Sequence, residues 1–146
     1  MTQLTDHFSL EELTASSTAC RLCIDNTPHD IQILANLQLA AEGLEQVRAL
    51  LGKPMHIDSG YRCETLNRAV NGAVASDHLL GYAADFICPD FGTPLEIVTC
   101  IVTSGIKFDQ CIQEGTWVHI SFNPRMRNEV LTAHFGAGGT TYTQGA

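Results

Sequence analysis

Apolar residues recur every three or four positions after Thr27 and Pro28, and this spacing is typical of one face of an α-helix. The recurring positions are Ile31, Leu34, Leu37, Ala41, Leu44, Val47 and Leu51. Thr27 offers an N-cap and Pro28 a first-turn proline, while Gly52 and Pro54 end the pattern. We therefore expect a long core helix that packs against a sheet.

Three shorter helices are expected besides the long one. Ser9 and Glu12 match a capping box, because each side chain can satisfy a free amide in the first turn of a helix. Thr93 and Pro94 repeat the combination of a cap and a first-turn proline. The expected ranges are residues 10–16, 61–70 and 93–105.

Strands are expected mainly in the C-terminal half of the chain. The expected ranges are residues 55–59, 82–87, 108–112, 117–122 and 129–133. An order in which helices come first and strands gather later favours an α+β domain. We expect the N-terminal helices to pack on a small, mainly antiparallel sheet.

The length of 146 residues suits one domain with one hydrophobic core. We expect residues 1–135 to form this domain. Residues 136–146 have the Gly- and Thr-rich sequence GAGGTTYTQGA and are expected to form a flexible tail.

Charge and hydropathy exclude several classes of protein. The formal net charge is -8 and eight residues are Lys or Arg, so binding of nucleic acid, which needs clustered cations, is not expected. No apolar stretch approaches the roughly 18 residues that a membrane span needs. The first residues lack the basic and apolar regions of a signal peptide. We expect synthesis in the cytosol.

The six cysteines are few for a disulfide scaffold of this length, and free thiols are expected. Cys20 and Cys23 have the CxxC spacing of a zinc knuckle or a redox pair, but no second pair of this kind is present. Two ordinary cysteines near a helix end are the favoured interpretation.

Alternation of side chains along two of the expected strands places Asp85 and His119 on the faces opposite to the apolar residues. His78 precedes the first of these strands, and Gly81 allows a sharp turn that brings the imidazole back over it. Two histidines and a carboxylate, with a fourth tetrahedral position left for water, are typical of catalytic zinc. The spacing alone also fits ordinary roles in a turn cap, a salt bridge and a surface strand.

A family resemblance adds to this pattern. Residues 76–85, SDHLLGYAAD, match every fixed position of the SxHxxGxAxD signature of the zinc D-Ala-D-Ala carboxypeptidases. Residues 117–119 are similar to the WxH that supplies the third zinc ligand of that family, and residues 59–62 resemble its segment with a carboxylate-binding arginine. These enzymes are related to phage L-alanyl-D-glutamate endopeptidases and to the hedgehog signalling domain. The chain resembles most the small phage or prophage members, which implies a hedgehog/DD-peptidase-like fold.

The resemblance implies that Zn2+ is bound by His78, Asp85 and His119. It also implies that Arg62 binds a peptide carboxylate or a carbonyl near the scissile bond, and that Ser76 forms a hydrogen bond close to the same place. A surface ion pair is the alternative role for the arginine. Bound zinc would lower the pKa of its water towards about 7 and polarise the scissile carbonyl.

One position departs from the family pattern. Family members carry Glu or Asp three residues before the last histidine, as a general base, and Thr116 stands there in this chain. Glu114 is the favoured substitute, because Gly115 allows a turn or bulge that carries the carboxylate to the metal. Asp109 and the absence of any base are the alternatives. Asp77 is a candidate for orienting a ligand histidine.

Two functions are compatible with these residues. The favoured one is a zinc peptidase that cuts peptidoglycan stem peptides, as an endolysin-like endopeptidase or a D,D-carboxypeptidase. It would act as a monomer on the cell wall, after release by lysis or a holin or from a virion. The alternative, motivated by Thr116, is a non-catalytic zinc-containing module for wall binding or virion structure.

Overall fold

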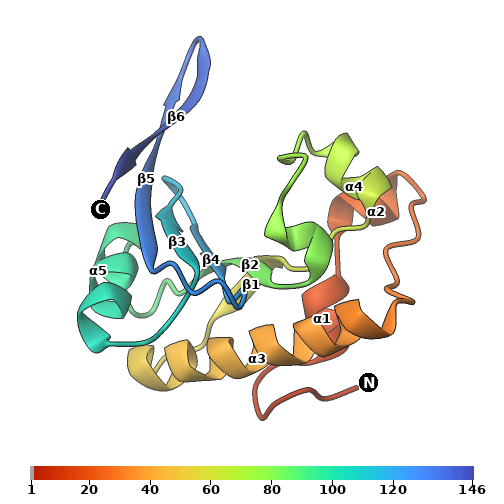
Figure 1. The fold of residues 1–146 in the computed structure, drawn as a ribbon, viewed down its shortest axis with the longest axis horizontal. Coiled ribbons are helices and arrows are strands. Elements are labelled where there is room, and N and C mark those ends of the chain that lie inside the picture. Colours follow the sequence, from red (N-terminus) through yellow and green to blue (C-terminus); the bar gives the residue numbers. More distant parts are fainter. Residues whose placement is uncertain (1) are drawn as a thin grey trace.

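The computed structural model describes residues 2–146, which form five α-helices, one short 3-10 helix and a six-stranded sheet (Figure 1). The helices are α1 (Leu10–Thr14), α2 (Ser17–Arg21), α3 (Ile31–Leu51), α4 (Glu64–Ala69), η1 (Asp77–Leu80) and α5 (Pro94–Ser104). The strands are β1 (His56–Ser59), β2 (Ala83–Ile87), β3 (Gln110–Gln113), β4 (Val118–Ser121), β5 (Glu129–Gly136) and β6 (Gly139–Gln144). The α+β class is confirmed.

The strand order in the sheet is β1-β2-β4-β3-β5-β6. Every neighbouring pair is antiparallel except β3 and β5, which run parallel. The prediction of a mainly antiparallel sheet is therefore confirmed. The order also makes β2 and β4 neighbours, as convergence of Asp85 and His119 requires.

One hydrophobic core lies between the helices and one face of the sheet. The helices α3 and α5 lie along the same side of the strands (Figure 1). Buried core residues include Leu37, Leu44 and Val47 of α3, Ile97 and Ile101 of α5, and Phe86, Val118 and Ile120 of the sheet. Because side chains alternate along a strand, the polar residues between these apolar ones lie on the opposite face.

The long helix α3 has the predicted end, and its predicted apolar face is buried from Leu37 to Leu51, whereas Ile31 is 84% exposed. Gly52 follows it with a φ of 67°, in the left-handed region that favours glycine. The predicted start is wrong. The N-cap is Asp30, whose carboxylate accepts a hydrogen bond from the Gln32 amide at 2.7 Å, and the helix begins at Ile31 instead of Pro28. Asp30 takes the place of Thr27 as the N-cap because aspartate is among the residues that cap helices most strongly.

Two of the shorter helices also differ from expectation. The helix α1 ends at Thr14, and a separate helix, α2, follows with Ser16 as its cap. The helix α4 begins at Glu64 because the Cys63 side chain caps it, with Sγ 3.5 Å from the amide nitrogen of Leu66. Short helices depend on such local caps more than on periodicity, so their bounds are weakly encoded in the apolar pattern.

The segment predicted to be a flexible tail contains strand β6. It pairs with β5 from the Gly136–Gly139 turn to the Leu131–Gln144 pair, so β5 is also longer than expected. Glycines favour the turn, while the Thr and Tyr residues after it favour a strand. The prediction was based on the glycines and missed the strand. The mobility of this hairpin in solution stays a prediction.

All six cysteines are free thiols, as expected. Within residues 2–146, no helix combines the length and the apolar character that crossing a membrane requires.

Candidate metal centre

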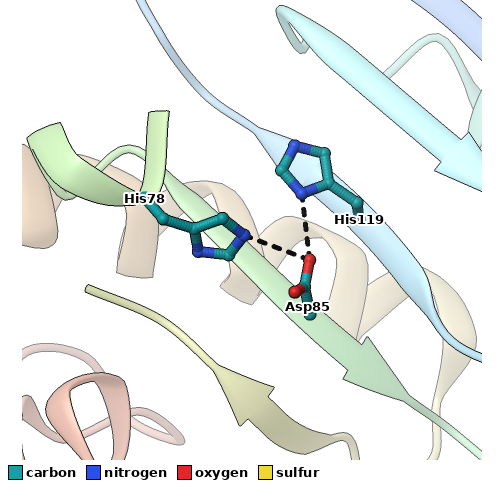
Figure 2. Close-up of side chains that lie close together, drawn as sticks. All are labelled: His78, Asp85 and His119. Atoms are coloured by element: carbon teal, nitrogen blue, oxygen red, sulfur yellow. Dashed lines mark hydrogen bonds and ion pairs between the residues drawn. The ribbon is translucent and has the colours of Figure 1, made fainter. Parts of the chain in front are cut away.

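The structure brings His78, Asp85 and His119 together, as the sequence predicted (Figure 2). Asp85 of β2 and His119 of β4 are direct partners in the antiparallel register. The Asp85 Oδ1 atom lies 2.9 Å from His119 Nδ1 and 3.2 Å from His78 Nε2. One possible ligand atom from each residue lies within 4.8 Å of the others. The three side chains can therefore reach one metal ion.

His78 is positioned by the short helix η1. The Ser76 hydroxyl caps this helix by accepting a hydrogen bond from the His78 amide at 3.2 Å, and Gly81 ends it with a φ of 84°. The His78 Nδ1 atom lies 2.6 Å from the carbonyl oxygen of Gly60. A carbonyl oxygen only accepts hydrogen bonds, so Nδ1 carries the proton and Nε2 presents a lone pair to the site.

The charge states of these groups favour a bound cation. His78 is 1% exposed, and burial lowers the pKa of its imidazole although the Asp85 carboxylate opposes this. For Asp85 itself, burial raises the pKa, but His78 and His119 outweigh it and hold the pKa well below its usual range. At neutral pH a lone pair of His78 therefore faces an ionised oxygen of Asp85. Two acceptors are stable at this distance when a proton or a metal ion lies between them.

This donor set fits zinc. Neutral imidazole nitrogens and a carboxylate oxygen are preferred ligands of Zn2+, and three protein ligands are typical of its catalytic sites. Among residues 2–146, no second cluster of histidine, cysteine or carboxylate side chains meets the geometry of a metal site. Cys20 and Cys23 are exposed and lie outside it.

A cavity of about 660 Å³ opens over the three residues. It is also lined by Arg62, Ser76 and Glu114, so every predicted site residue reaches it. Thr116 lies elsewhere and lines a smaller pocket beside Cys88. The position that carries the acid in the family pattern therefore does not face this cavity.

Glu114 enters the cavity through the turn between β3 and β4. Its amide donates to the Trp117 carbonyl at 2.9 Å, and Gly115 has a φ of 81°, which confirms the expected turn at the glycine. Burial raises the pKa of the Glu114 carboxyl; His119 opposes the rise and Asp85 adds to it. A raised pKa suits a carboxylate that accepts and returns a proton near neutral pH.

Arg62 lines the cavity and has one buried donor atom without a partner in the described part of the chain. Its amide donates to the His78 carbonyl at 3.0 Å, which ties it to η1. Its Nε atom is buried and makes no hydrogen bond within residues 2–146. Burial lowers the pKa of the guanidinium and Asp85 opposes this, but an arginine remains charged at neutral pH. Because Arg62 lines the cavity, its planar guanidinium is available to a ligand oxygen.

Asp77 does not orient a ligand histidine, which corrects the sequence interpretation. The carbonyl of Gly60 has that role for His78. The Asp77 carboxylate instead accepts from the Ser121 hydroxyl at 2.6 Å and from Arg125 Nη2 at 3.0 Å. It therefore fastens η1 to the end of β4.

Sequence reasoning missed a charged network beside the cavity. Asp109 is 0% exposed and accepts from Arg127 Nε at 2.9 Å and from Arg125 Nη2 at 3.0 Å. A carboxylate held in this way is not free to act as the base, so Asp109 is excluded as the alternative to Glu114. The two arginines at alternate positions of the segment 123–128 were the only feature of the sequence that pointed to this network.

Comparison with known proteins identifies the family of the chain. The family model described as Peptidase M15 matches residues 6–121, which is most of the sequence. The chain belongs to the peptidase M15 family. The match contains all three residues of the metal centre as well as Arg62 and Glu114, and M15 enzymes are zinc peptidases. Among curated proteins, no sequence matches this M15 peptidase. Strands β5 and β6 lie outside the matched region.

Proposed function

We propose that this M15 peptidase is a zinc enzyme that hydrolyses peptide bonds in peptidoglycan stem peptides. The observation that carries the proposal is the convergence of two imidazole nitrogens and a carboxylate oxygen at the base of a cavity. The same cavity is lined by the arginine Arg62 and by Glu114, whose carboxyl group has a raised pKa. These are the groups that hydrolysis of an amide bond requires.

His78, Asp85 and His119 would hold the zinc ion. When bound, zinc lowers the pKa of a coordinated water towards about 7 and polarises a carbonyl group. The carbonyl of Gly60 keeps the His78 lone pair directed at the site. Such partners fix the orientation of ligand imidazoles.

Glu114 is the proposed general base. Its carboxylate would take a proton from the attacking water and then give this proton to the nitrogen of the leaving amine as the C–N bond breaks. The proton balance closes within one turnover. The raised pKa reduces the cost of holding the proton between the two transfers.

Arg62 and Ser76 are the proposed substrate-binding residues. The planar guanidinium of Arg62 can donate to both oxygens of a carboxylate, or to a carbonyl near the scissile bond. The Ser76 oxygen accepts the bond that caps η1, which leaves its hydroxyl proton for a substrate oxygen in the cavity. Together they would fix the peptide against the metal centre.

The proposed substrate class is the wall peptide, cut by an endolysin-like endopeptidase or a D,D-carboxypeptidase activity. The enzyme would act as a monomer, after lysis or from a virion. A non-catalytic zinc module is the competing function, and Thr116 is the observation that favours it. Glu114 lines the cavity, so a carboxylate is present there although Thr116 stands at the position of the family's acid, and this favours the enzyme.

The direct test is digestion of purified peptidoglycan by the zinc-loaded protein, followed by mass spectrometry of the released fragments. We expect new peptide termini that are lost when a chelator is present. Unchanged muropeptides from protein that contains stoichiometric zinc would contradict the peptidase and support the binding module.

A further inference from the structure

The β5–β6 hairpin has two distinct faces. Pairing of Phe135 with Thr140 and of Ala133 with Tyr142 places these residues on one face, and Thr141 and its partner His134 on the other. Of the first face, Leu131, Phe135, Thr140 and Tyr142 line the cavity of the metal centre. The hairpin rises beyond the rest of the sheet (Figure 1). One of its faces is therefore a wall of that cavity.

The wall is aromatic and open to solvent. The residues Phe135 and Tyr142 are 58% and 50% exposed. The ring of Trp117, two residues before His119, lies 6.2 Å from that of Phe135, with 47° between the planes. Aromatic side chains thus continue from Trp117, just before β4, onto the hairpin. Exposed aromatic groups that line a cavity are typical of binding sites, because they offer a large contact area at low entropic cost.

The opposite wall consists of small residues. It is formed by the segment between α4 and η1, where Val70, Gly72, Ala73 and Ala75 line the cavity. The base of the cavity is polar, and both walls present apolar side chains beside polar ones such as Asn71 and Thr140. Its volume of about 660 Å³ falls within the usual range of ligand pockets, roughly 300–1,000 Å³. This arrangement suits an extended peptide that reacts at the base and continues between the walls.

We propose that the C-terminal hairpin binds the substrate, and that Phe135 and Tyr142 select an oligopeptide several residues long over a dipeptide. The proposal rests on the proposed peptidase function and specifies its substrate class. A dipeptide held by Arg62 would make fewer contacts with the aromatic wall than a longer peptide, so it would gain less affinity from them.

The Tyr142 hydroxyl also supplies a hydrogen-bond donor. Burial raises the pKa of the phenol, and the Glu114 and Asp85 carboxylates raise it further. The hydroxyl is therefore protonated at neutral pH and can donate to a peptide carbonyl. The hairpin lies outside residues 6–121, so this wall is not part of the region that defines the family.

Trp117, the only tryptophan of the chain, provides the measurement. A synthetic stem pentapeptide and the dipeptide D-Ala-D-Ala would be titrated into zinc-loaded E114Q protein, with the Kd read from tryptophan fluorescence and checked by calorimetry. We expect the pentapeptide to bind more tightly. Phe135→Ala and Tyr142→Ala should each weaken its binding about tenfold and weaken dipeptide binding much less.

The variants separate the possible contributions. Tyr142→Phe keeps the ring and should lose a smaller part of the affinity than Tyr142→Ala. Thr141→Ala, on the outer face of β6, is the matched control and should bind like the parent protein. Unchanged pentapeptide affinity in both alanine variants would contradict the proposed role of the hairpin. The same would follow if these variants lost as much affinity for a glycan fragment without peptide.

Failure of the proposed function gives a different result. If the zinc-loaded parent binds no stem peptide and wild-type protein releases no peptide from peptidoglycan, the peptidase proposal fails and the wall proposal fails with it. If wild-type protein cleaves peptidoglycan while the alanine variants keep full affinity, the wall proposal alone is overturned.

Discussion

At the scale of single residues, the metal centre depends on which nitrogen of His78 carries the proton. The Gly60 carbonyl holds that proton on Nδ1, and burial keeps the imidazole neutral. The lone pair on Nε2 then faces the ionised Asp85. Two acceptors that face each other in this way are stable when a proton or a metal ion lies between them.

Glu114 is expected to be necessary for turnover but not for metal binding. Glu114→Gln should lower kcat by about 10²- to 10⁴-fold, the usual contribution of a general base, and leave the zinc content unchanged. Steady-state assays on a wall peptide with parallel zinc determination would measure both. Thr116→Ala is the control, because Thr116 lines the other pocket, and it should keep wild-type activity. Full activity of the Gln variant would remove Glu114 from the mechanism.

Asp109 is expected to make stability depend on pH. Burial raises the pKa of its carboxyl, but the hydrogen bonds and charges of Arg127 and Arg125 outweigh this and lower it overall. A lowered pKa in the folded state means that the unfolded chain takes up the proton first as pH falls. The stabilisation is therefore complete above about pH 4 and is lost as pH falls through the folded pKa.

Asp109→Asn tests this expectation. It should lower the free energy of unfolding at pH 7 by about 2 kcal/mol, because charged hydrogen bonds to Arg127 are replaced by weaker ones. Denaturant titrations at pH 7, 5 and 3.5 would measure it, with Asp90→Asn as an exposed control. The difference between wild type and Asp109→Asn should shrink at the lowest pH. A difference that does not change with pH would contradict the assignment.

At the scale of the elements, the metal centre depends on how closely β1, α1 and η1 approach. Gly60 follows β1 and has no room for a side chain, because a Cβ there would overlap the carbonyl of Leu13 at the end of α1. The same glycine supplies the carbonyl that holds His78. Packing of the helix and orientation of the ligand are therefore coupled at one residue.

Gly60→Ala should consequently affect both stability and zinc binding. Overpacking should cost about 1–3 kcal/mol of unfolding free energy. Displacement of the carbonyl should weaken zinc binding by about 10- to 100-fold, as loss of such partners does elsewhere. Gly43→Ala is the matched control: its Cβ would overlap the Phe122 ring, so it should destabilise the fold with little effect on zinc affinity. Equal effects of both variants on zinc affinity would refute the coupling.

Elements with a strong local signal were predictable from the sequence. The apolar repeat of α3 and its Gly52 end are examples, because periodicity and a left-handed cap depend on neighbouring residues. The start of α3 was not predictable from the sequence, because Thr27 and Asp30 are both good caps and tertiary packing decides which of them is used. The hairpin at β6 was missed because its glycines resemble those of a mobile tail.

Only part of the candidate site was predictable. The signature residues and the strand alternation placed His78, Asp85 and His119 correctly on one surface. The role of Gly60 was hidden, since a backbone carbonyl leaves no trace in the residue type. The contacts of Asp109 with Arg125 and Arg127 join positions 16 and 18 residues apart, and no local pattern specifies such pairs.

At the scale of the whole molecule, zinc should act as a clamp between η1 and the sheet. An ion that binds only the folded chain stabilises it by about 4 kcal/mol at a free concentration a thousandfold above its Kd. For a chain of this length, that corresponds to a rise in Tm of about 10 °C. Calorimetry of zinc-loaded and chelated protein would measure the shift. In Asp85→Asn, the rise in Tm on addition of zinc should be much smaller. A rise as large as that of the wild type would mean that zinc binds elsewhere.

The most direct test of the central claim, that His78, Asp85 and His119 hold a catalytic metal, is the zinc content of purified protein. Wild-type chain, loaded with zinc and dialysed, should retain one zinc ion per molecule by elemental mass spectrometry. His119→Ala should retain little, while His134→Ala, on the outer face of the hairpin, should bind like wild type. Zinc retained equally by folded His119→Ala protein, or by neither protein, would contradict this account of the site.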